Sequence, residues 1–167
     1  MNRIYYLSLG CPKNRVDTEH ALGSLSGLCP VLTVENPEDA DCIFIHTCGL
    51  IAPGIEESVR TLMETIAVVS DLPAASRPLL VVAGCLVGRY GKETLAPDLP
   101  EVDLFIDNRE LATWGLQLCS ALSTRNVTKK STLDGSGILE PAAGNAAALP
   151  RLLSTGPSYA WLKISYG

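Results

Sequence analysis

The sequence predicts an α/β fold, a doubly wound and mostly parallel sheet of about five strands with helices on both faces. Apolar runs alternate with segments of helical periodicity along residues 1–122, which is typical of repeated βαβ units. The run at 79–83 is rich in β-branched residues and bounded by turn residues, as central parallel strands are. Three such runs each lead into a cysteine, with 36 residues between Cys11 and Cys48 and 36 between Cys48 and Cys85. Each interval is long enough for a helix and a return strand.

The first strand is expected at 4–9 and is followed by a helix over 14–28. Asn14 is of a residue type that caps helix N-termini, apolar residues follow at helical spacing, and Pro30 ends the helix. Short apolar runs then predict strands at 31–34 and 42–46, separated by a turn at 35–39.

A second helix is expected to begin at Pro53, because proline suits the first helical position and acids follow in the first turn. Its apolar residues recur at helical spacing: Val59, Leu62, Met63, Ile66 and Val69. The central strand at 79–83, a short helix at 87–95 and a last strand at 102–106 follow. Asn108 is expected to cap a helix that reaches Leu122.

The composition changes after residue 122. Residues 123–155 are rich in Ser, Thr, Gly, Asn, Ala and Pro without a sustained period, which indicates a flexible linker. Residues 159–165 are strand-like but have no partner strands of their own. The sequence therefore predicts a domain over 1–122, a linker over 123–155, and at 156–167 the first strand of a truncated further domain.

The charge distribution excludes some partners. The net charge is −5, and residues 1–122 hold 16 acidic and 8 basic side chains. An acidic body is a poor match for a phosphate backbone, so we expect no direct nucleic-acid binding. No apolar run approaches the roughly 20 residues of a membrane span, and the start of the chain lacks the features of a secretory signal. We therefore expect a cytoplasmic protein that does not bind membranes.

The three cysteines at strand ends form the candidate site. Because the carboxyl ends of parallel strands meet at one edge of a sheet, Cys11, Cys48 and Cys85 are expected to converge. Disulfides are disfavoured in the cytosol, so such cysteines indicate metal or redox chemistry. Thiolates favour iron–sulfur clusters or zinc, and three of them leave one coordination position open. The remaining cysteines are interpreted as structural: Cys29, Cys42 and Cys119.

Two other interpretations use the same residues. A structural zinc site would need a fourth protein ligand, and His46 is the nearby candidate, although a satisfied buried histidine is the commoner finding. A flavodoxin-like nucleotide-binding domain would make the cysteines incidental, but the chain lacks the GxGxxG spacing. Lys13, Arg89 and Tyr90 flank two of the cysteine loops. They can be interpreted equally well as contacts to a cluster or as solvated loop residues.

Three motifs carry a family resemblance. SLGCPKNRVDTE at 8–19, HTCGLIAPGIEES at 46–58, and GCLVGRY at 84–90 followed by PEVDLFI at 100–106 resemble the N-terminal domain of radical-SAM methylthiotransferases. The closing YAWLKISYG looks like the strand that leads into the radical-SAM cysteines of that family. SLGCPKN and TCG are similar to the ribosomal-protein branch rather than to the tRNA-adenosine branch.

The resemblance implies a function for the whole enzyme. Cys11, Cys48 and Cys85 would bind an auxiliary [4Fe–4S] cluster whose open iron carries the sulfur. The missing domain would hold a second [4Fe–4S] cluster and S-adenosylmethionine. The substrate would be the β-carbon of an aspartate in small-subunit ribosomal protein twelve, free or in the small ribosomal subunit.

The fragment alone would then have no catalytic residues and no activity. Two positions depart from the family pattern, which usually has Asn at His46 and an acid at Tyr166. The alternative within the family is a tRNA adenosine methylthiotransferase.

Overall fold

The computed structural model describes residues 1–130, 151–155 and 158–164. In these residues five strands form one sheet in the order β2-β1-β3-β4-β5, and every neighbouring pair is parallel. The strands are β1 (Asn2–Ser8), β2 (Val31–Thr33), β3 (Cys42–Thr47), β4 (Leu79–Gly84) and β5 (Leu104–Asp107). The predicted α/β class is confirmed, and the strand order is that of flavodoxin-like sheets.

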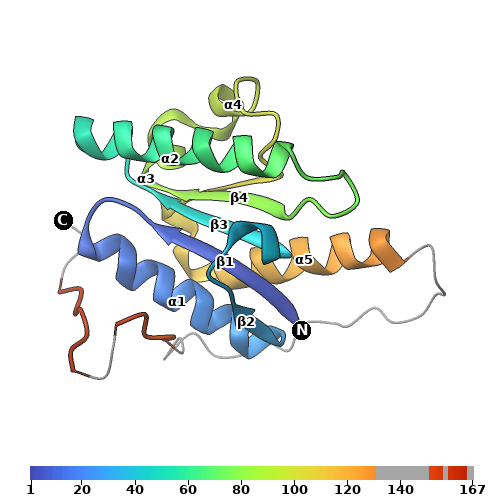
Figure 1. Cartoon of the computed structure of the whole chain (residues 1–167). Helices are drawn as coiled ribbons and strands as arrows, with labels where there is room; N and C mark the ends of the chain where they lie inside the picture. Colours follow the sequence, from blue (N-terminus) through green and yellow to red (C-terminus); the bar gives the residue numbers. More distant parts are fainter. Residues whose placement is uncertain (131–150, 156–157, 165–167) are drawn as a thin grey trace.

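Helices cover both faces of the sheet (Figure 1). One face packs against α1 (Pro12–Leu28) and α5 (Trp114–Lys130), and the other packs against α2 (Ala52–Ser70), α3 (Cys85–Tyr90) and α4 (Lys92–Leu95). The strand β3 lies between two layers and is buried along its whole length. Phe44 faces α1 and α5, whereas Ile43 and Ile45 face α2, as the alternation of side chains along a strand requires.

Several element boundaries differ from those predicted. Helix α1 begins at Pro12 with Cys11 in the N-cap position, so Asn14 is not the cap. The helix expected at 87–95 is two helices that meet at Gly91, where a φ of +78° interrupts the helical path. After β5 a 3-10 segment, Asn108–Thr113, precedes α5. Asp107, and not Asn108, caps this 3-10 segment, because its carboxylate accepts a hydrogen bond from the Arg109 amide.

The inward face of α2 is narrower than the apolar pattern predicts. Leu62, Ile66 and Val69 are buried, but Val59 and Met63 are 46% and 52% exposed. Ser58 takes the buried position one turn before Leu62, because its hydroxyl binds the backbone of Cys48. This polar contact joins α2 to the Cys48 loop.

Helix α5 continues to Lys130, so residues 123–130 belong to the helix and not to the predicted linker. Residues 131–150 lie outside the described part of the chain, as do 156–157 and 165–167. Residues 158–164 have no regular secondary structure, and the strand expected there stays a prediction for a longer protein that supplies partner strands. Among the described helices, none combines the length and the apolar content of a membrane span.

Candidate metal centre at the carboxyl edge of the sheet

The three cysteines lie at the ends of three adjacent strands. Cys11 follows β1 at the start of α1, Cys48 follows β3 directly, and Cys85 follows β4 as the first residue of α3. The register aligns Ser8 with His46 and Thr47 with Gly84, so the three strands end at nearly the same level. The structure thus brings the three sequence-predicted site residues to one edge.

The loops that carry the cysteines are in close contact. A Cβ atom on Gly10 would lie 2.6 Å from the Cβ of Cys48, and one on Gly49 would lie 2.4 Å from the carbonyl oxygen of Cys85. Gly10 also has a φ of +81°, which side chains rarely allow. Glycines at positions 10 and 49 are therefore needed for the cysteine loops to pack this closely.

The three thiols also share an electrostatic environment. Burial raises the pKa of the Cys85 thiol, and the neighbouring Cys48 and Cys11 raise it further. Like charges at short range explain the second effect, and a bound cation would reverse it. Cys48 is buried, Cys85 is half-buried and Cys11 is exposed, so the site opens to solvent on the Cys11 side.

Hydrogen bonds hold the backbone around the site. The side-chain amide of Asn14 donates to the carbonyl of Leu9 at 2.8 Å and to that of Thr47 at 3.3 Å, which ties the Cys11 loop to the Cys48 loop. The Ser58 hydroxyl accepts from the Cys48 amide at 2.9 Å and donates to the Gly54 carbonyl at 2.7 Å. Asn14 is thus a buried bridge rather than the helix cap that the sequence suggests.

Arg89 ties the third loop to the second. Its Nη1 donates to the carbonyl of Gly49 at 2.9 Å, and its guanidinium lies 5.5 Å from the ring centroid of Tyr90. Lys13 is exposed at the start of α1. Of the three flanking residues considered from the sequence, Arg89 therefore has a structural role in joining the cysteine loops.

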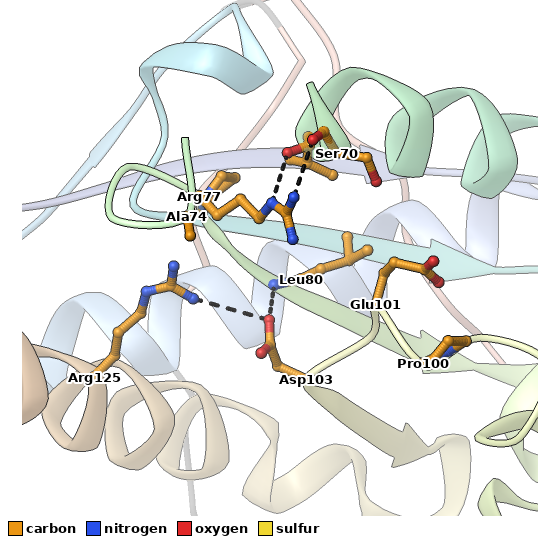
Figure 2. Close-up of a pocket in the computed structure, with 10 residues that line it drawn as sticks. Ser70, Ala74, Arg77, Leu80, Pro100, Glu101, Asp103 and Arg125 are labelled. Atoms are coloured by element: carbon orange, nitrogen blue, oxygen red, sulfur yellow. Dashed lines mark hydrogen bonds and ion pairs between the residues drawn. The ribbon is translucent and has the colours of Figure 1, made fainter. Parts of the chain in front are cut away.

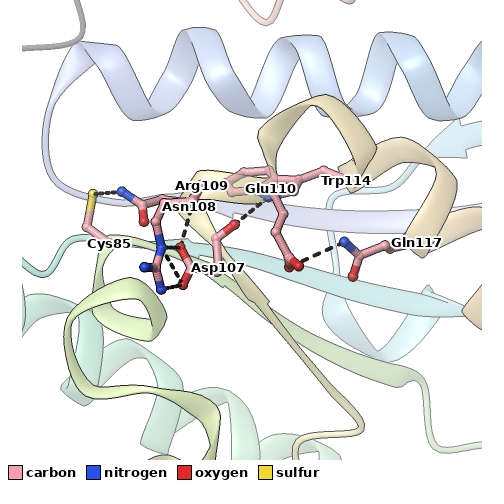
Figure 3. A network of polar contacts seen from close by, with 7 residues as sticks. All are labelled: Cys85, Asp107, Asn108, Arg109, Glu110, Trp114 and Gln117. Carbon is pink, nitrogen blue, oxygen red and sulfur yellow. Dashed lines mark hydrogen bonds and ion pairs between the residues drawn. The ribbon is translucent and has the colours of Figure 1, made fainter.

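Asn108 is a site residue that sequence reasoning missed. Its Nδ2 lies 3.7 Å from the sulfur of Cys85 and points toward it (Figure 3). A Cβ atom on Gly88 would lie 2.2 Å from its Oδ1, so the amide packs closely on α3. Asn108 follows the end of the last strand and so lies at the same edge as the cysteines, although its residue type predicts a helix cap. The neighbouring Asp107 is the cap, because its Oδ1 accepts a hydrogen bond from the Arg109 backbone amide at 2.8 Å.

His46 lies beneath the Cys85 turn. It is 1% exposed, its Nδ1 is 2.9 Å from the Thr18 hydroxyl, and its ring meets that of Trp114 edge-on with centroids 4.8 Å apart. Burial lowers the pKa of His46 to about 3, so the ring is neutral. These contacts give His46 a packing role in the described structure.

The other cysteines lie away from the site. Cys42 is buried within β3, where burial raises its pKa. Cys29 follows the end of α1, and burial together with a hydrogen bond to Cys119 raises its pKa to about 12. In the described part of the chain, no three His, Cys, Asp or Glu side chains are gathered tightly enough to hold a single metal ion.

A cavity of about 270 Å³ lies at the opposite edge of the sheet (Figure 2). Arg77 is one of its lining residues and donates to the carbonyls of Val69 and Ser70 at the end of α2, at 3.1 and 3.0 Å. Asp103 accepts from the backbone of Leu80 at 2.7 Å and pairs with Arg125 at 3.9 Å. These polar groups serve the fold, and none of them faces the cysteines.

Comparison with known proteins gives consistent matches. The family model described as "Uncharacterized protein family UPF0004" matches residues 3–107. A protein of Nitratidesulfovibrio vulgaris named "Ribosomal protein uS12 methylthiotransferase RimO" is 51% identical over 167 residues, all of this chain and 34% of the relative. Proteins of the same name from Oleidesulfovibrio alaskensis and Lawsonia intracellularis are 50% and 44% identical, over 100% and 99% of this chain and 34% and 32% of their own. The chain thus spans about a third of the length of these relatives.

Proposed function

The chain belongs to the UPF0004 family, and from that membership and from the three cysteines at one edge of the sheet we propose that it is the N-terminal, cluster-binding domain of a radical-SAM methylthiotransferase. The observation that carries the proposal is the meeting of Cys11, Cys48 and Cys85 at the ends of three adjacent strands. The domain comprises residues 1–122 with the extension of α5 to Lys130, followed by a linker to residue 155 and the start of a radical-SAM domain at 156–167.

The donor set suits a [4Fe–4S] cluster. Three thiols supply ligands for three irons, and ligands that bind different irons lie farther apart than those of one ion. Zinc would need a fourth protein ligand, whereas His46 is buried and engaged by Thr18 and Trp114. The three cysteines and the surrounding amide donors therefore fit the cluster better than they fit zinc.

When bound, this cluster would supply an open iron that carries the sulfur to be methylated and transferred. The residues of this chain would hold and orient it. Cys48 would anchor the buried side and Cys11 the open side, where a substrate approaches. Asn108 would donate a hydrogen bond to the Cys85 sulfur, and Asn14 and Arg89 would fix the spacing of the loops.

The proposed substrate follows from the relatives. They are named for ribosomal protein uS12, the small-subunit protein twelve, and we propose that the whole protein methylthiolates an aspartate β-carbon of it, free or in the small subunit. The rest of the protein would provide a second [4Fe–4S] cluster and S-adenosylmethionine. The acidic body of this domain supports a protein substrate over tRNA.

Mass spectrometry after reaction of the full-length, cluster-loaded protein tests this function. With S-adenosylmethionine, a reductant and a sulfide source, we expect one methylthio group on a uS12 aspartate and none on tRNA offered in parallel. Cys48→Ala should abolish the product, because the buried ligand is lost, whereas Cys119→Ala should retain it. Modification of tRNA alone, or full activity of Cys48→Ala, would refute the proposal.

A further inference from the structure

Glu19 is a buried carboxylate whose partners come from the far end of the chain. It is 0% exposed, and both its oxygens are bound. Arg151 pairs with Oε2 at 2.6 and 2.7 Å, while the Ser154 amide and hydroxyl donate to Oε1 at 2.8 and 2.5 Å. The Leu152 amide donates to the Glu19 carbonyl at 3.0 Å. Residues 151–155 therefore bind α1 through one specific acid.

Burial raises the pKa of Glu19, but the hydrogen bonds from Ser154 and Arg151 outweigh this and lower it. The carboxylate is thus charged at neutral pH, and a buried charge without its partners is strongly destabilising. The buried charge of Glu19 on α1 therefore depends on Arg151 and Ser154 for its stabilisation.

A second ion pair lies nearer to the cysteines. Lys163 binds both oxygens of Asp17 at 2.7 and 2.8 Å, and the two side chains are 13% and 14% exposed. Asp17 lies between Cys11 and Glu19 along α1. This pair is therefore nearer than Glu19 to the start of the helix, where Cys11 lies.

The contacts of Glu19 and Asp17 show in which direction residues 151–155 and 158–164 run along α1. Residues 151–154 bind at Glu19, and Lys163 binds at Asp17, closer to the start of α1. The described part of the segment accordingly runs beside α1 toward the cysteine edge (Figure 1). We define the C-terminal segment as residues 151–155 and 158–164.

We propose that α1 is a docking surface for the C-terminal segment, that Glu19 is its anchor, and that this docking holds the continuation of a longer chain beside the three cysteines. The relatives are about three times as long as this chain, so such a continuation exists in them. The positioning role rests on the proposed function, because methylthio transfer needs the second domain close to the cluster. The docking itself rests on the contacts of Glu19 and Asp17.

Amide hydrogen exchange of the 167-residue chain tests the docking. The Leu152 and Ser154 amides, which donate to Glu19, should be protected in the unmodified chain. Glu19→Ala and Arg151→Ala should each accelerate their exchange at least about tenfold while the amides of β3 are unaffected. Arg151→Ala alters the segment alone, so its result does not depend on the folding of a changed helix.

Glu64→Ala is the matched control, since it removes an exposed acid from α2 and should change neither amide. Unprotected amides in the unmodified chain, or unchanged protection in Glu19→Ala and Arg151→Ala, would overturn the docking.

A measurement on the full-length protein separates this inference from the proposed function. Glu19→Ala should retain the iron and sulfide of the unmodified protein but transfer the methylthio group more slowly, because the second domain is no longer held in place. Loss of iron from Glu19→Ala, or an unchanged transfer rate, would overturn the positioning role. Failure of the unmodified protein to bind a cluster would refute the proposed function, whereas the exchange rates would still decide the docking.

Discussion

Replacing Gly84 by alanine is expected to lower the free energy of unfolding by about 2–6 kcal/mol and to displace Cys85 from the candidate metal centre. Gly84 has φ +108° and ψ −156°, a conformation open almost only to glycine, and such strain costs about 1–3 kcal/mol in other residues. The added Cβ would also lie 2.4 Å from Cδ2 of His46 and 2.7 Å from the Thr47 carbonyl. His46 cannot retreat, because Thr18 and Trp114 hold it, so overpacking adds about 1–3 kcal/mol.

Gly91→Ala is the matched control for this prediction. Gly91 also has a positive φ, +78°, but its added Cβ would meet only a side-chain oxygen of Glu93, at 3.4 Å. Urea unfolding of both variants should show a cost of about 1–3 kcal/mol for Gly91→Ala, from backbone strain alone. Equal losses in the two variants would show that the contact between Gly84 and His46 does not constrain the turn.

The second large effect is expected at Trp114, for which alanine should cost about 3–5 kcal/mol of unfolding free energy. This side chain is 1% exposed and meets Phe44 edge-on at 5.9 Å and His46 at 4.8 Å. Its Nε1 donates to the carbonyl of Asp107 at 2.9 Å, which fixes the end of β5 next to Asn108. The variant therefore loses core packing and the support of one side of the metal centre together.

Trp161→Ala provides the control with the same change of residue type. Trp161 is 43% exposed and contacts Tyr159, so its loss should change the free energy of unfolding by less than about 1 kcal/mol. Chemical denaturation followed by far-UV circular dichroism measures both variants. A similar cost at the two positions would contradict the placement of Trp114 in the core between α5 and the sheet.

The sheet and the placement of the three cysteines at one of its edges could be predicted because their signals are local. The runs before Cys11, Cys48 and Cys85 identify strands, and the carboxyl ends of parallel strands lie at one edge of the sheet. They are neighbours here because β1, β3 and β4 are adjacent. The sequence alone does not predict the strand order, and its prediction that Asn14 and Asn108 are helix caps is wrong. Both are common capping residues. The position of Asn108 after the last strand puts it at the cysteine edge, but the sequence does not show that its amide faces a sulfur or that the amide of Asn14 bridges two loops.

Glu19 shows most clearly what sequence reasoning could not provide. Glu19 is an acid on a predicted helix, where such side chains are mostly exposed, yet its partner Arg151 lies 132 residues further along the chain. The partner residues follow a segment whose composition predicts a linker, so no local pattern points to a buried ion pair. A contact of this kind depends on the route of the chain in three dimensions.

Anaerobic reconstitution of the 167-residue chain with iron and sulfide tests the central claim most directly. The account predicts about four irons and four sulfides per chain, with visible absorbance typical of a [4Fe–4S] cluster. Cys11→Ala, Cys48→Ala and Cys85→Ala should each abolish this content, and Cys119→Ala should retain it. A chain that binds no iron and sulfide, or that binds them regardless of these three substitutions, would contradict the assignment of the metal centre.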